Sequence, residues 1–95
     1  MEGDDHEDAL KSFCYRVWLY CFRFRGSVSS WIRTPHRNVL VGGVRNSFHV
    51  RGLAADVVLD DPSIAPVMTD DRHRYALELG LKLIIEADHD HLQLS

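Results

Sequence analysis

Histidine and aspartate side chains occur at two places in this chain in a pattern that could bind a metal ion. His49 and Asp56 are seven residues apart with Gly52 between them, and His91 follows in a second acidic segment. A catalytic zinc ion takes three protein ligands and leaves a fourth position open for water. A glycine lets one loop and strand turn back to supply two ligands, and the third comes from a distant element. The three residues fit this description, although the His-Asp spacing alone is more often a surface histidine and a turn aspartate.

The elements that must position these residues are mixed helices and strands. Apolar residues recur at helical spacing over 8–22, and Gly26 follows as a stop. A helix is also expected over 70–79, with Thr69 as its N-cap and Gly80 after its end. The segments 27–32, 53–59, 81–86 and 91–94 are expected to be strands, and 36–40 a helical turn. Without a βαβ rhythm, this order predicts an α+β fold with a small antiparallel sheet packed by helices.

Composition bounds the class of protein. The chain has 45% apolar and 26% charged residues, which is typical of a soluble globular domain. We expect a polar N-terminal leader over 1–7 and a single domain over 8–95, acting as a monomer. The net charge of -3 argues against nucleic acid as a partner, although most basic residues lie between Lys11 and Arg51.

No apolar run approaches the roughly 20 residues needed to cross a bilayer, so no membrane insertion is expected. The N-terminus is acidic, whereas a secretory signal would be basic. The chain is therefore expected to be synthesised in the cytoplasm without a signal peptide. It would act outside the cell only if it is released or exported.

The two cysteines, Cys14 and Cys21, are expected on one face of the first helix. Seven residues of helix separate them by roughly 10.5 Å, which is too far for a disulfide. We interpret them as small buried hydrophobic residues, with metal ligation as the alternative. Trp18 and Trp31 are expected in the core or in the wall of a cleft.

Two motifs carry a resemblance to a known family. One segment matches the pattern SxHxxGxAxD at every defined position, and its residues are Ser47-Phe48-His49-Val50-Arg51-Gly52-Leu53-Ala54-Ala55-Asp56. This segment resembles the signature of the M15 zinc metallopeptidases. That family contains D-Ala-D-Ala carboxypeptidases and phage L-alanyl-D-glutamate endopeptidases, and it shares its fold with the Hedgehog signalling domain. The upstream segment is similar to the family's SGYRSPxxN…VGG pattern, with Trp31-Ile32 in place of Gly-Tyr, and its residues are Ser30-Trp31-Ile32-Arg33-Thr34-Pro35-His36-Arg37-Asn38 and Val41-Gly42-Gly43.

The resemblance implies a role for each matching residue. His49, Asp56 and His91 would hold one zinc ion, and Asp88, three residues before the last ligand, would be the catalytic carboxylate. The bound zinc would lower the pKa of a water molecule, and the carboxylate would accept its proton as the peptide carbonyl is attacked. Arg33 falls on the family's arginine that holds a substrate carboxylate, a role suited to a two-pronged guanidinium.

Three other residues compete for these roles. Glu86 and Asp90 are rival bases, but on an extended strand Asp90 would point away from His91. His89 would share the face of His91, where it could donate a hydrogen bond to the substrate or replace His91 as a ligand. We favour His91 as the ligand, because this choice gives Asp88 its family spacing.

The sequence therefore predicts a zinc-dependent, endolysin-like peptidase that cleaves peptidoglycan stem peptides. Whether it removes a terminal D-alanine or cuts the L-Ala–D-Glu bond is left open, because both substrates carry a carboxylate. The alternative is a Hedgehog-like zinc-containing binding module without peptidase activity. A phosphate or nucleic-acid site built from Arg33, Arg37, Arg45 and Arg51 is disfavoured by the negative net charge.

Overall fold

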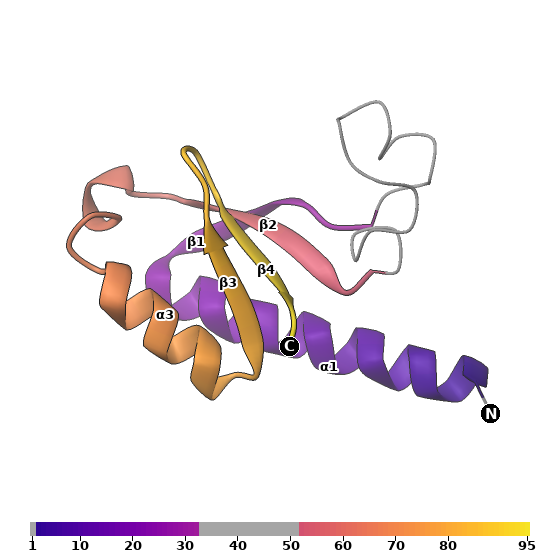
Figure 1. The fold of residues 1–95 in the computed structure, drawn as a ribbon. Helices are drawn as coiled ribbons and strands as arrows, with labels where there is room; N and C mark the ends of the chain where they lie inside the picture. Colours follow the sequence, from indigo (N-terminus) through magenta and orange to yellow (C-terminus); the bar gives the residue numbers. More distant parts are fainter. Residues whose placement is uncertain (1, 33–51) are drawn as a thin grey trace.

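The structure is a computed structural model, and it describes residues 2–32 and 52–95 (Figure 1). The expected helical turn at 36–40 and the glycine pair Gly42-Gly43 lie outside the described residues. In the described part, the elements follow one another in the order α1, β1, β2, a short 3₁₀ helix, α3, β3 and β4.

The first helix, α1, spans Glu2–Phe24, so it begins six residues before the predicted start at position 8. Its buried residues are Phe13, Val17, Tyr20 and Phe24, which recur every three or four positions and form one stripe. Trp18, which also lies in the predicted helical range, is outside this stripe and is 57% exposed. Both faces of the helix carry large apolar residues, and packing against the sheet decides which face is buried.

The chain turns sharply from α1 into the first strand. Arg25 adopts a positive φ of 54° directly after the helix, so the predicted stop at Gly26 is one residue late. Gly26 instead begins β1, which spans Gly26–Ser30. A Cβ atom on Gly26 would lie 2.5 Å from Val57 Cγ1, and this close approach explains the glycine.

The remaining strands complete an antiparallel sheet. β2 spans Ala54–Leu59, β3 spans Leu81–Ile85 and β4 spans Asp90–Leu94. The strand order is β1-β2-β4-β3, and every neighbouring pair is antiparallel. The predicted α+β fold with a small antiparallel sheet packed by helices is therefore confirmed.

The second long helix, α3, spans Thr69–Glu78 and follows the 3₁₀ helix η1 at Pro62–Ile64. The N-cap is Met68 rather than the predicted Thr69, whose hydroxyl instead donates to the carbonyl of Ala65 at 3.0 Å. Gly80, with a positive φ of 70°, follows the end of the helix as predicted.

Both helices lie on one face of the sheet (Figure 1). Ala55, Val57 and Leu92 of the central strands are buried together with the inner stripe of α1 and Ala76 of α3. Because side chains alternate along a strand, Asp56 and His91 belong to the opposite face. No helix in the described residues is long and apolar enough to cross a membrane.

Candidate active site

Asp56 and His91 lie opposite each other in the sheet. They are register partners on β2 and β4, and His91 Nδ1 lies 3.1 Å from Asp56 Oδ1. Two ligands of a tetrahedral zinc, each about 2.0 Å from the metal, are separated by roughly 3.3 Å. The 3.1 Å separation is that of a hydrogen bond, and it is also close to the spacing of two neighbouring ligands on one zinc ion.

The second ring nitrogen of His91 faces Gln93, two residues further along β4. His91 Nε2 lies 2.9 Å from Gln93 Oε1, so the ring N–H can donate to the amide oxygen. In the tautomer with its hydrogen on Nε2, Nδ1 would keep the lone pair that a cation shared with Asp56 requires. Sequence analysis missed Gln93, although its two-residue spacing from His91 already places both on one strand face.

His89 lies between Asp56 of the sheet and Asp88, the expected base. Its Nε2 lies 3.7 Å from Asp56 Oδ1, and its Nδ1 lies 2.6 Å from Asp88 Oδ1. His89 therefore shares the face of His91, as expected, but its nitrogen is farther from Asp56 than that of His91. The Asp88 side chain is 89% exposed. The hydrogen bond from His89, reinforced by its charge, lowers the pKa of Asp88 and keeps this carboxylate ionised.

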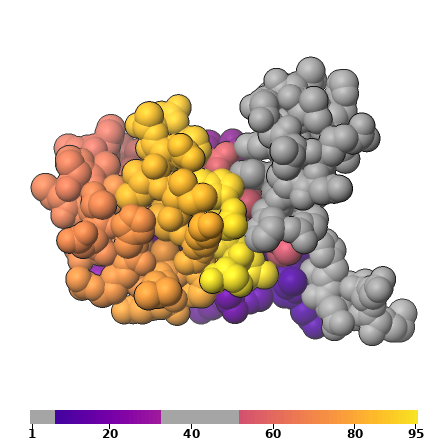
Figure 2. Space-filling model, in the orientation of Figure 1, coloured from indigo at the N-terminus to yellow at the C-terminus, as the bar shows by residue number. Residues whose placement is uncertain are grey.

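The residues of the hairpin loop border a hollow of about 350 Å³. Glu86, Asp88 and His89 line it together with Val58 and Leu59 of β2, and so do Arg72 and Asp90, which lie on the side of the sheet opposite His91. The loop is closed by a hydrogen bond from the Glu86 amide to the His89 carbonyl, 2.9 Å long. Figure 2 shows this hairpin, in yellow, on the outer surface of the molecule. Asp88 is thus open to solvent, but neither Asp56 nor His91 lines this hollow.

Asp90 lies on the other side of the same strand, as its alternation with His91 predicted. It is buried, and its carboxylate contacts Tyr20 and Arg72. This position excludes Asp90 as a base acting on the face of His91. Neither Tyr20 nor Arg72 was singled out from the sequence, since no local pattern marks a buried ion pair formed between distant elements.

Two expected site residues, Arg33 and His49, lie outside the described residues. Among residues 2–32 and 52–95, no group of three or more His, Cys, Asp or Glu side chains is arranged to hold a metal ion. His49, the third ligand that the sequence predicts, is not among these residues.

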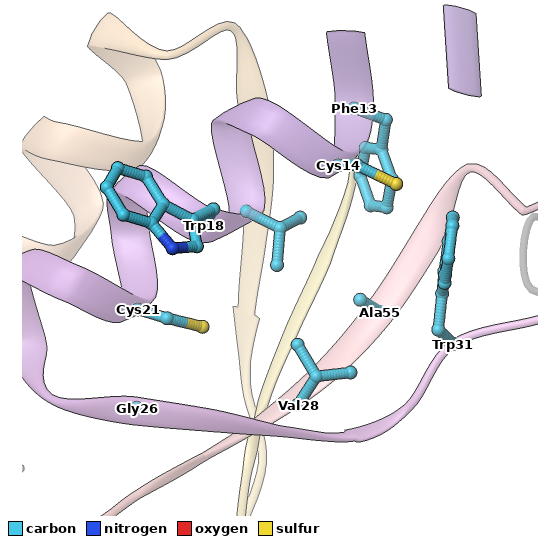
Figure 3. A pocket seen from close by; sticks show the side chains of 9 residues that line it. Phe13, Cys14, Trp18, Cys21, Gly26, Val28, Trp31 and Ala55 are labelled. Atoms are coloured by element: carbon cyan, nitrogen blue, oxygen red, sulfur yellow. The ribbon is translucent and has the colours of Figure 1, made fainter. Parts of the chain in front are cut away.

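A second hollow, of about 380 Å³, lies between α1 and the sheet and is apolar (Figure 3). Cys14, Trp18 and Cys21 of α1 line it, and Trp31 closes the opposite side. The expectation that both cysteines are buried is wrong for Cys14, which is exposed, while Cys21 is half-buried. Both thiols are free, as their spacing predicted, and the two tryptophans form cleft walls.

The sequence of this chain was compared with models of known protein families. A family model described as Peptidase M15 matches residues 21–93, a range that contains Asp56, Asp88 and His91. No curated protein and no solved structure matches the chain. The match covers most of the chain and agrees with its α+β fold. The chain belongs to the peptidase M15 family.

Proposed function

We propose that this chain is a zinc-dependent peptidase that hydrolyses peptidoglycan stem peptides. Its zinc ligands are His49, Asp56 and His91, and Asp88 is its general base. The observation that carries the proposal is the 3.1 Å spacing of Asp56 Oδ1 and His91 Nδ1 on paired strands. This pair lies within the range that matches a peptidase family.

The donor set fits zinc in its chemistry as well as in its spacing. Imidazole nitrogen and carboxylate oxygen are both common zinc ligands, and the amide of Gln93 fixes the ring orientation of His91. Zinc bound there lowers the pKa of a water molecule towards neutrality and stabilises negative charge on the carbonyl oxygen of the substrate.

Asp88 and His89 supply the proton chemistry in this proposal. Asp88 is ionised at neutral pH, so Oδ1 or Oδ2 can accept the proton of the attacking water, and the hydrogen bond from His89 lowers its pKa further. The carboxylic acid then returns that proton to the leaving amine. His89 contacts Asp88 through Nδ1, and its Nε2, 3.7 Å from Asp56 Oδ1, can donate a hydrogen bond to the substrate. Arg33 holds a substrate carboxylate near the scissile bond.

The test measures zinc content and cleavage of purified muropeptides for the wild type, Asp88→Ala and His91→Ala. Asp88→Ala should keep its zinc and lose about 10²–10⁴-fold in turnover, because a general base contributes that much. His91→Ala should lose both zinc and turnover. Glu86→Ala is the matched control, since it removes the rival carboxylate from the same loop and should leave both properties unchanged.

Full cleavage by Asp88→Ala would show that this residue is not the base. A wild type that binds zinc but cleaves no muropeptide would instead support the alternative, a Hedgehog-like zinc-containing binding module. Mass spectrometry of the products decides between loss of a terminal D-alanine and cleavage of the L-Ala–D-Glu bond.

A further inference from the structure

A buried polar cluster lies beneath the strand that carries His91. The Tyr20 hydroxyl donates to Asp90 Oδ2 at 2.6 Å, and Arg72 Nη1 donates to Asp90 Oδ1 at 2.5 Å. Arg72 Nη2 also donates to the carbonyl of Ala65 at 2.8 Å. The side chains of Arg72 and Asp90 are only 3% and 4% exposed. The Tyr20–Asp90–Arg72 cluster therefore joins α1, α3 and β4 inside the core.

Stability alone gives no reason for this cluster. Removing an ion pair from water costs about as much as the attraction between its charges returns, and apolar side chains of similar volume often replace such pairs without loss. The cluster is also imperfect, because Arg72 Nε is buried without a hydrogen-bond partner in the described part of the chain. A buried polar arrangement of this kind is better explained by structural specificity, because its hydrogen bonds form in only one arrangement of the chain.

In the hairpin of β3 and β4, the feature to be specified is the register of the two strands. β3 reads Leu81-Lys82-Leu83-Ile84-Ile85, so apolar residues occur on both of its faces. This pattern lets β3 present an apolar face in either register, so the register is set by β4, whose buried face carries Leu92 and Asp90; a slip of one residue exchanges the two faces. If β4 slipped in that way, Asp90 would turn to the face of Asp56 and His91 would turn into the core.

We propose that the Tyr20–Asp90–Arg72 cluster locks the register of β4, so that His91 and His89 stay on the face of Asp56. Only one placement of the strand brings the Asp90 carboxylate between the Tyr20 hydroxyl and the Arg72 guanidinium. The three are positioning residues, because they act on the site through the strand without touching it. The consequence for zinc binding rests on the proposed function, whereas the register itself does not.

The main test replaces the whole cluster by apolar residues in the triple variant Tyr20→Phe/Arg72→Met/Asp90→Leu. NMR cross-strand contacts between Asp56 and His91 and between Ile84 and His91 report the register. Zinc affinity is measured by chelator competition. We expect a folded protein with a second set of β3–β4 amide signals and zinc binding weakened about 10–100-fold, the loss typical of disturbed ligand orientation. Val17→Ala, at a buried position of α1, is the control and should lower only the melting temperature.

Tyr20→Phe provides a second variant that removes only a hydroxyl group, so it stays informative if the triple variant fails to fold. It should weaken zinc binding several-fold and broaden the amide signals of β4. Unchanged cross-strand contacts and unchanged zinc affinity in the folded variants would overturn the proposal. If the wild type bound no zinc, the proposed function would fail, but the NMR contacts would still test the register lock.

Discussion

Replacing Gln93 by leucine should weaken zinc binding without unfolding the protein. The structure gives His91 Nε2 an oxygen acceptor at 2.9 Å, and leucine fills a similar volume without offering one. Loss of the hydrogen-bond partner of a metal-binding histidine typically costs about 10–100-fold in metal affinity, or roughly 1.4–2.8 kcal/mol. Gln93 is only half-buried, so water can partly replace it, and we expect a value near tenfold.

The assay is competition for zinc against a chromophoric chelator at neutral pH, with thermal melts to verify the fold. Gln93→Glu should keep or raise the affinity, because a carboxylate accepts the same hydrogen bond more strongly. Lys82→Leu is the matched control, since Lys82 is exposed and lies opposite Gln93 in the ladder. Equal zinc affinities for Gln93→Leu and the wild type would refute the proposed orientation of His91.

Three further predictions concern the core, the thiols and the proposed base. Leu92 is fully buried between the two layers, so Leu92→Ala should lower the free energy of unfolding in urea by about 2–5 kcal/mol. Burial raises the pKa of Cys21 to about 11, so at pH 8 its thiolate fraction should be roughly 100-fold below that of an ordinary thiol. After treatment with an alkylating reagent, mass spectrometry should find the exposed Cys14 modified before Cys21. His89→Ala removes the hydrogen bond that lowers the pKa of Asp88, so the acid limb of the pH profile of kcat/KM should move to higher pH; an unmoved limb would contradict the role of Asp88.

The parts of the fold that follow from local chemistry could be predicted from the sequence. The alternation along 53–59 predicted β2 and the face of Asp56, and the same rule separated His91 from Asp90. The glycine after 70–79 predicted the end of α3, which the positive φ of Gly80 confirms. These predictions succeeded because each depends on a few neighbouring residues and on the two-residue period of a strand.

Features that depend on distant contacts were predicted less well. On α1, spacing alone could not choose between two apolar stripes, so Tyr20 was missed and Cys14 was wrongly expected to be buried. The start of the helix at Glu2 was missed, because the residues before position 8 carry no apolar period. The ion pair between Arg72 and Asp90 joins residues 18 positions apart in different elements, and nothing in either local sequence reveals it. The roles of all the expected site residues, and the division into leader and domain, stay predictions.

The central claim, that one zinc ion at Asp56 and His91 makes this chain a peptidase, can be tested by a single titration. Zinc is added in steps to metal-free wild-type protein, and muropeptide cleavage is measured at each step. The account predicts that activity rises in proportion to bound zinc and reaches its plateau at one ion per chain. Full cleavage by the metal-free protein, or no cleavage at one bound zinc per chain, would contradict it.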